Sequence, residues 1–296
     1  MTSLKKLAYR GAFWTIAGLG TSQVIRFGNN LILTRLLVPE YYGLMAIVNT
    51  LRMGIELFSD IGIAQSIVNN PSGDEPSFRN TAWTLQIIRG FLVCFALLLI
   101  TVPVARIYDD SRLLWLIPIM GLCSAIDGFN STAIHTFQRR LDLGKLTRFD
   151  LTILILAVLT MITWAYLSPS IWALAIGVVA AALYKVIGSH WLIPGYNNRF
   201  AWNQHALREI ISFGRLIFVA TALMFMADQA DRLILGKLFT FETLGVYSIA
   251  YGLANIPRET IKKLSHRVIF PAISNQADIP RSTLRNKILR QRKVII

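Results

Sequence analysis

The first candidate for chemistry is a polar stripe inside the first long apolar stretch of the chain. Ser22, Gln23, Arg26, Asn29 and Asn30 recur at steps of three and four residues, which places them on one face of a helix. An ionisable side chain at the centre of a membrane costs roughly 2.5–3.5 kcal/mol, so it is expected to face a partner or a wet cavity. A guanidinium binds phosphate oxygens through paired hydrogen bonds. The stripe therefore predicts a hydrated cavity in which Arg26, Asn29 and Asn30 bind an anionic head group.

A second group of charges follows a strict four-residue spacing. Arg52, Glu56 and Asp60 share one helix face, so that neighbours can pair. One interpretation gives Arg52 to the same substrate cavity, and gives Glu56 and Asp60 to charge pairing or to proton uptake during a transport cycle. The alternative is a set of internal salt bridges that only hold the helices together.

A third group lies near the other end of the chain, where Asp228, Asp231 and Arg232 share a helix face. We expect these three residues to line the cavity as well, with the same structural alternative. Arg89, Asp127 and Lys185 are isolated candidates, and for Arg89 and Lys185 the simpler expectation is that they extend to a membrane interface.

The other reactive residues do not form any pattern typical of an enzyme active site. The four histidines have no metal-ligand spacing, the two cysteines form no CxxC pair, and nucleotide-binding and hydrolase motifs are absent. We therefore expect no catalytic residue, no metal and no cofactor, and a protein that is not an enzyme.

The composition places these charges in a membrane protein. Hydrophobic residues make up 54% of the 296 residues and charged residues only 16%, against about 25% charged residues in a typical soluble protein. The net charge is +14, but the basic residues lie between apolar runs and form no single patch. This distribution disfavours nucleic acid as a partner and fits the positive-inside rule.

Apolar stretches of membrane length predict an all-α, polytopic membrane protein. A bilayer core needs roughly 20 apolar residues for each helix. Eight stretches qualify, the last of them interrupted by Pro257 and by charges: about 12–36, 42–68, 82–105, 113–137, 150–167, 171–193, 212–238 and 244–270.

The basic residues orient these spans. The side that holds the N-terminus collects sixteen of them, namely Lys5, Lys6, Arg10, Arg79, Arg139, Arg140, Lys145, Arg148, Arg199, Arg208, Arg281, Arg285, Lys287, Arg290, Arg292 and Lys293. The opposite side holds four, which are Arg35, Arg106, Arg112 and Lys237. This bias predicts that both termini are cytoplasmic.

An internal repeat predicts two lobes. The stretch "LILTRLLVPEYYGLMAI" from residue 31 returns as "LILGKLFTFETLGVYSI" from residue 233, so that Gly43 aligns with Gly245. The offset spans six helices, an even number, so both copies have the same orientation, as in parallel transporter repeats. We expect residues 1–200 to form a six-helix lobe. Residues 201–296 then form an incomplete second lobe of two helices with a basic cytoplasmic tail, since no further membrane-length apolar run follows.

Several stretches resemble the polysaccharide transport family of the multidrug/oligosaccharidyl-lipid/polysaccharide flippase superfamily. They are "GAFWTIAGLGTSQVIRFGNNLILTRLLVPEYYGLMAIV", "FSDIGIAQSIV", "NTAWTLQIIRG", "TFQRRLDLGKL" and "DRLILGKLFTFETLGVYSIAYGLANIP", and the resemblance covers residues from about 8 to 275. It implies a bacterial inner-membrane protein of two helical bundles. Such proteins move polyprenyl-pyrophosphate-linked oligosaccharide to the outer leaflet by alternating access, for exopolysaccharide, capsule or O-antigen biosynthesis.

The same resemblance implies the partners, which are the lipid-linked oligosaccharide, membrane lipids, and the polysaccharide polymerase and assembly proteins. The tail after Ile279 departs from the family pattern. We therefore expect a C-terminally truncated member, and one interpretation is that this chain is inactive alone. Two alternatives stay open. One is a multidrug or small-cation exporter of the same superfamily, and the other is a non-transporting scaffold or gene relic of a polysaccharide assembly system.

Overall fold

Every regular element in the described part of the chain is helical, as the apolar pattern predicts. The computed structural model describes residues 2–140, 142–193 and 196–258. Its elements are α1 (Thr2–Leu36), α2 (Pro39–Phe58), α3 (Ile63–Asn69), the 3-10 turn η1 (Pro71–Asp74), α4 (Pro76–Tyr108), α5 (Leu113–Gly128), α6 (Ala133–Arg139), α7 (Leu143–Leu167), α8 (Ile171–His190), α9 (Gln204–Leu238) and α10 (Phe241–Ala254).

Three of these helices, α4, α7 and α8, are long and apolar enough to cross a membrane. The α5–α6 pair, bent by 62°, makes a fourth if the two helices form one span. The full count of eight spans therefore stays a prediction. The eighth expected stretch, 244–270, lies only partly within the described residues, and the basic tail from Arg281 lies outside them.

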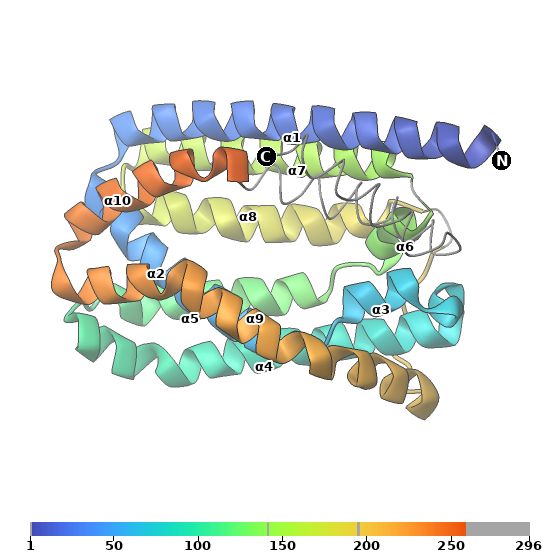
Figure 1. Cartoon of the computed structure of the whole chain (residues 1–296). Coiled ribbons are helices and arrows are strands. Elements are labelled where there is room, and N and C mark those ends of the chain that lie inside the picture. The colour runs from blue at the N-terminus through green and yellow to red at the C-terminus, as the bar shows by residue number, and fades with distance from the viewer. Residues whose placement is uncertain (1, 141, 194–195, 259–296) are drawn as a thin grey trace, which may run out of the picture.

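The helices alternate in direction between two ends of the molecule. The start of α1 lies at one end with the α3–α4 turn and the α6–α7 connection, and we call this the inner end (Figure 1). The α1–α2, α4–α5, α7–α8 and α9–α10 connections lie at the opposite, outer end (Figure 1). All the loops expected on one side of the membrane thus lie at one end of the molecule, and those expected on the other side lie at the opposite end. Which end faces the cytoplasm remains a prediction.

Two of the expected spans are broken towards the inner end. Residues 42–68 divide into α2 and α3 at Gly62, whose φ of 69° is left-handed, and Asp60 Oδ1 accepts a 3.0 Å hydrogen bond from the Gly62 amide. Residues 113–137 divide between α5 and α6, where the Asn130 side-chain amide donates to the Asp127 carbonyl at 2.8 Å. Glycine tolerates the left-handed region at low cost, and short polar side chains compete for backbone groups, so both breaks have a local cause.

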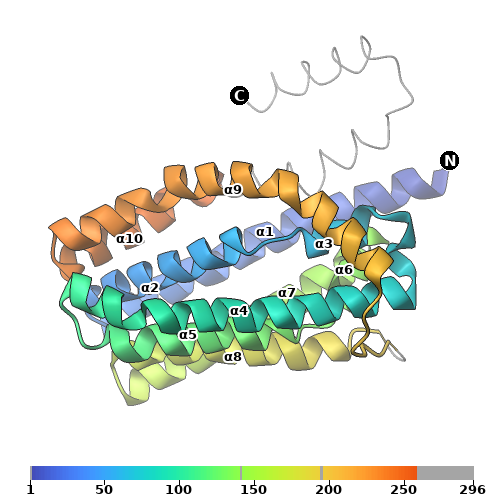
Figure 2. The ribbon, with the colours of Figure 1, turned by 90° about the horizontal axis from the view of Figure 1, so that it is seen from below.

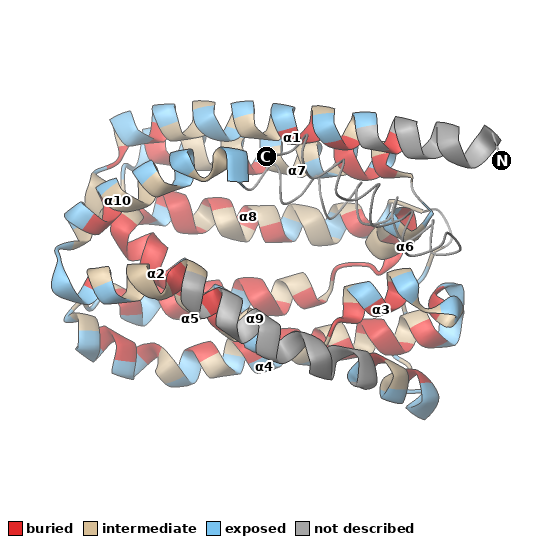
Figure 3. Ribbon diagram, in the orientation of Figure 1, coloured by how far each residue is buried: buried red, intermediate tan, exposed pale blue. Residues whose placement is uncertain are grey.

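The hydrophobic core lies between α2, α4, α5 and α8. Leu44, Leu97, Leu116 and Met120 are fully buried there. The other faces of the long helices carry large exposed apolar side chains, such as Phe95 of α4. Figure 3 shows buried positions concentrated on α5 and α8 and exposed positions along α1. An apolar outer surface suits a lipid environment, in which backbone groups are satisfied within the helices.

The two copies of the repeat pack against each other at the outer end. A Cβ atom added to Gly43 of α2 would lie 1.9 Å from the Phe241 carbonyl oxygen, and one added to Gly245 of α10 would lie 1.9 Å from the Pro39 carbonyl oxygen. Pro39 and Phe241 are themselves equivalent in the repeat, so the contact is reciprocal. Only glycine allows two helix backbones to approach this closely.

Helix α9 adds a second connection at the outer end. Tyr108 Oη donates to the Leu233 carbonyl at 3.0 Å, and Lys237 Nζ donates to the Ile107 carbonyl at 2.5 Å. Figure 2 shows α9 running obliquely to α4, which it contacts. The lobe division at residues 200 and 201 stays a prediction.

The glycine contact predicts a sharp difference between alanine substitutions. Gly43→Ala or Gly245→Ala should lower the free energy of unfolding by about 1–3 kcal/mol, because the new methyl group meets a backbone carbonyl that cannot move aside. Gly20→Ala is the control, since nothing lies within 4 Å of its added Cβ, and it should be neutral or gain up to about 1 kcal/mol from helix propensity. Thermal unfolding of the purified variants in detergent measures the difference. Equal midpoints for Gly43→Ala and Gly20→Ala would contradict the packing.

An ionic cluster also closes the α4–α5 turn at the outer end. Arg112 forms ion pairs with Glu40 of α2 and with Asp110, at 2.6 Å for Asp110 Oδ2. Burial by itself would raise the pKa of Asp110, but the hydrogen bonds from Arg112 outweigh it and lower that pKa. The same hydrogen bond to Asp110 raises the pKa of Arg112.

This lowered pKa predicts an acid-sensitive turn. The stability that the Asp110 carboxylate adds is complete above its unfolded pKa of about 3.9 and is lost as the pH falls through the lower folded value. Asp110→Asn should therefore destabilise the protein by about 1–3 kcal/mol at neutral pH, and the difference should shrink below about pH 4. Thermal midpoints of both proteins across this range test it. A difference that does not change with pH would refute the role of the charge.

Candidate functional site

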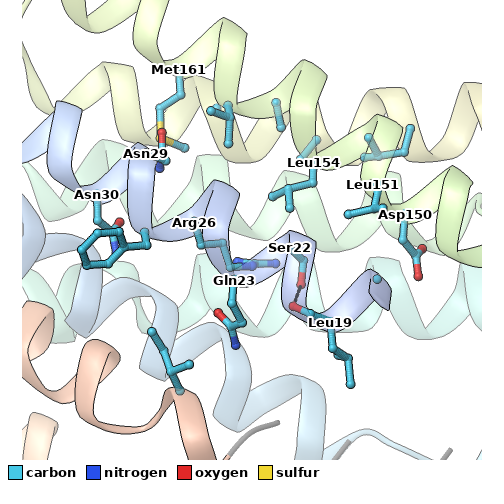
Figure 4. A pocket seen from close by; sticks show the side chains of 18 of the residues that line it. Leu19, Ser22, Gln23, Arg26, Asn29, Asn30, Asp150, Leu151, Leu154 and Met161 are labelled. Atoms are coloured by element: carbon cyan, nitrogen blue, oxygen red, sulfur yellow. Dashed lines mark hydrogen bonds between the residues drawn. The ribbon is translucent and has the colours of Figure 1, made fainter. Parts of the chain in front are cut away.

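A cavity of about 620 Å³ lies between α1, α7, α8 and α10. The whole polar stripe of α1 lines it, namely Ser22, Gln23, Arg26, Asn29 and Asn30. Figure 4 shows these side chains together with Asp150, Leu151, Leu154 and Met161 of α7. We call this space the Arg26 cavity. The three-and-four spacing thus correctly predicted that the stripe would share one face.

Arg26 is an accessible cation in this cavity. It has no hydrogen bond or ion pair within the described part of the chain, and its side chain is exposed. Asn29 donates to Met161 Sδ at 3.9 Å, a weak bond, while its buried Oδ1 atom has no hydrogen-bond partner among the described residues. A guanidinium has five donors, so the cavity offers donors to an anion.

The wall facing Arg26 mixes charges with apolar side chains. Asp150 of α7 and Lys185 of α8 supply the other ionisable groups of the cavity, and Leu154, Ala157 and Val158 supply apolar surface. Asp150 was not predicted as a site residue, because it lies at the start of an apolar run. Its four-residue spacing from Leu154 and Val158, which puts all three on one face of α7, was the available signal. The cavity can therefore hold a ligand with both a charged and an apolar part.

The expected second-lobe residues lie apart from this cavity. Asp228 forms an ion pair with Arg258 at 2.7 Å, and Asp231 accepts a hydrogen bond from the Tyr247 hydroxyl. Arg232 donates to Gln229 at 3.0 Å and lies over the ring of Tyr251. None of Asp228, Asp231 and Arg232 is among the residues that line the Arg26 cavity. Their predicted part in substrate binding stays a prediction.

Arg52 is the centre of an ion-pair network between α2 and α5. Its Nε donates to Glu56 Oε1 at 2.7 Å, and its Nη2 donates to Asp127 Oδ2 at 2.8 Å. Ser124 accepts from Arg52 at 3.0 Å and donates to Glu56 at 2.7 Å. The four-residue spacing correctly predicted the pairing of Arg52 with Glu56. Asp127 and Ser124 come from α5, and only the packing of α5 on α2 reveals them as partners.

A second cavity of about 310 Å³ adjoins this network, and we call it the polar cavity. Glu56, Asp60 and Asp127 line it together with Arg89. Arg89 does not extend to an interface as expected. It donates to the Glu56 carbonyl at 2.7 Å and to Ser59 Oγ at 3.2 Å, since the end of α2 offers these acceptors close by. Lys185 lines both cavities.

Neither cavity holds a recognisable metal centre. Within the described ranges, no group of three or more His, Cys, Asp or Glu side chains is arranged to hold a metal ion. The carboxylates of the network instead accept hydrogen bonds from Arg52 and Ser124.

Comparison with known proteins identifies the family. A model of the polysaccharide biosynthesis protein family matches residues 32–295. The chain belongs to this family. The match covers most of the chain and confirms the resemblance drawn from the repeated turn and its neighbours. No solved structure matches the chain.

Curated relatives of this family member are named for several polysaccharides. The lipopolysaccharide biosynthesis protein WzxC of Escherichia coli (strain K12) is 23% identical over 93% of this chain and 56% of its own length. The teichuronic acid biosynthesis protein TuaB of Bacillus subtilis (strain 168) is 22% identical over 100% of this chain and 61% of its own length. The succinoglycan biosynthesis transport protein ExoT of Rhizobium meliloti (strain 1021) is 20% identical over 90% of this chain and 53% of its own length. The chain thus spans little more than half the length of these relatives.

The Arg52 network predicts a large cost for losing its cation. The Arg52 side chain is only 14% exposed, so Arg52→Gln leaves Glu56 and Asp127 as neighbouring carboxylates with no shared guanidinium. We expect a loss of about 1–3 kcal/mol, less than for a fully buried pair because both carboxylates are about one-third exposed.

Lys145→Gln is the matched control, because Lys145 pairs with Asp142 at the surface, with 58% of its side chain exposed. That change should cost less than about 1 kcal/mol. Thermal unfolding of both variants in detergent tests the difference. Similar losses for Arg52→Gln and Lys145→Gln would show that the network adds no more than a surface pair.

Proposed function

We propose that the protein takes part in moving polyprenyl-pyrophosphate-linked oligosaccharide from the inner to the outer leaflet of the bacterial inner membrane. The product would feed the assembly of an exopolysaccharide, capsule or O-antigen. The movement would use alternating access of two helical lobes and would involve no catalytic step. Arg26 would bind the pyrophosphate.

The observation that carries this proposal is the accessible guanidinium of Arg26 in a cavity with an apolar wall. Charge-assisted hydrogen bonds to a pyrophosphate are roughly twice as strong as neutral ones. The leucine and valine side chains of α7 offer surface to the first isoprene units of the lipid. A ligand that is anionic at one point and apolar beyond it matches both features.

The relatives narrow the class of substrate without fixing its sugars. Their names refer to lipopolysaccharide, teichuronic acid and succinoglycan, which are three different polysaccharides. A shared family across them supports recognition of a common part, and the lipid-linked pyrophosphate is a part that does not vary with the sugar. The polymerase, the assembly proteins and the cytoplasmic placement of both termini belong to the same proposal.

A multidrug or small-cation exporter is the main alternative, and the charge of the cavity argues against it. An exporter of cations would need an acidic site, whereas Arg26 places on one wall a positive charge that forms no ion pair with the described residues. Neutral or cationic drugs would gain nothing from this guanidinium. The sign of the charge at residue 26 therefore separates the two functions.

Binding of polyprenyl pyrophosphate to the purified chain tests the proposal. Arg26→Ala should weaken binding about tenfold to a hundredfold, since hydrogen bonds to charged groups contribute about 1.5–3 kcal/mol. Arg26→Lys should retain part of the affinity, because a lysine keeps the charge and loses the paired geometry. Thermophoresis in detergent measures the dissociation constants.

Arg35→Ala is the matched control, because Arg35 is an exposed arginine of the same helix that does not line the cavity. It should bind the probe as the parent does. A second measurement is restoration of polysaccharide export in a flippase-deficient strain by the chain and by each variant. Equal affinity of Arg26→Ala and Arg35→Ala for the probe would exclude Arg26 as the pyrophosphate contact.

A further inference from the structure

The polar cavity has a chemistry that the proposed pyrophosphate site does not use. Its volume of about 310 Å³ lies at the lower end of the range of roughly 300–1,000 Å³ found for small-molecule sites. It is formed around the two helix breaks, by the end of α2, by α3, α4 and the end of α5, by the α5–α6 connection, and by α6 and α8. Side-chain amides line it from α3, from α4 and from the α5–α6 connection, namely Gln65, Gln86 and Asn130.

The charges around the polar cavity balance. Three carboxylates line it, Glu56, Asp60 and Asp127. Three cations accompany them, since Arg89 and Lys185 also line the cavity and Arg52 forms ion pairs with Glu56 and Asp127. A surround without formal net charge favours neither an anion nor a cation. Carboxylates accept, guanidinium donates and amides do both, which matches hydroxyl groups that donate and accept at once.

Two buried polar atoms in the cavity wall lack partners. Asn130 is only 7% exposed, and its Nδ2 atom donates to Asp127 while its Oδ1 atom has no hydrogen-bond partner in the described part of the chain. The same holds for Nδ1 of His135. An unsatisfied buried polar atom costs about 1–3 kcal/mol. Atoms of this kind in a cavity wall mark places where a ligand hydroxyl completes the hydrogen bonding.

Lys185 connects the two cavities, because it lines both of them. From these observations we propose that the polar cavity is a saccharide subsite that holds the sugar next to the pyrophosphate, with Asn130, Gln65 and His135 as its hydrogen-bonding residues. The subsite rests on the proposed function, because it needs the pyrophosphate at Arg26 to bring the sugar within reach. It adds a specific role for the first lobe, namely contact with the glycan itself.

The test compares two kinds of probe on the purified chain. One is bare polyprenyl pyrophosphate, and the other is the same lipid carrying a single glucose, galactose or N-acetylglucosamine. At least one of the three sugars should raise the affinity about tenfold over the bare lipid. Asn130→Ala and Gln65→Ala should each remove most of that gain and leave the affinity for the bare lipid within about twofold.

Gln65→Ala guards against a folding defect, because Gln65 is exposed and its side chain makes no hydrogen bond in the described residues. Gln138→Ala is the matched control, an exposed glutamine of α6 that does not line the polar cavity. It should bind every probe as the parent does.

The outcomes separate the subsite from the function on which it rests. If the bare lipid binds through Arg26 and none of the three sugars adds affinity, the saccharide subsite is overturned and the proposed function stands. The subsite is also overturned if Gln65→Ala and Asn130→Ala weaken the binding of bare and glycosylated lipids alike. If the bare lipid does not bind, or binds equally well to Arg26→Ala, both proposals are overturned.

Discussion

The close approach of α2 and α10 at their two glycines is the contact on which the rest of the arrangement depends. Each glycine lies against the backbone carbonyl of the first residue of the opposite helix. A side chain at either position would separate the helices. The glycine that both copies of the repeat share therefore allows the two copies to pack against each other. This contact, with the bonds from Tyr108 and Lys237 to neighbouring backbone carbonyls, holds the outer end together.

Because the helices pack closely at the outer end, the polar side chains meet in two cavities between the helices. The helices α1, α7, α8 and α10 leave the Arg26 cavity between them, and the breaks after α2 and α5 open the polar cavity next to it. Breaking a helix frees backbone groups that short polar side chains then satisfy, as Asp60 and Asn130 do. The same breaks concentrate amides and carboxylates around the polar cavity. In the proposed function, Arg26 beside its apolar wall and the charge-balanced polar cavity are complementary parts of one amphipathic binding site.

The sequence predicted those features that depend on residues close together in the chain. Apolar runs predicted the helices and their alternating ends, and the spacing along α1 placed five polar residues on one wall. It failed where the partner comes from another helix. Asp127 and Ser124 meet Arg52 only because α5 packs on α2, and the local pattern gave Arg89 no acceptor, so it was expected at an interface. The partners of Asp228 and Asp231 also come from outside their own helix, because Arg258, just after α10, pairs with Asp228 and Tyr247 of α10 donates to Asp231.

The most direct test of this account is a glycine-selective NMR measurement on the isotopically labelled chain in lipid. A Cβ on Gly43 would lie 3.1 Å from the Gly245 nitrogen, and the reverse distance is the same, so a through-space cross peak should join these two residues. Gly90 of α4 and Gly128 of α5 provide an internal control, with a Cβ on Gly90 lying 3.2 Å from the Gly128 Cα atom. The account predicts both cross peaks. A spectrum with the Gly90–Gly128 peak and without the Gly43–Gly245 peak would contradict it.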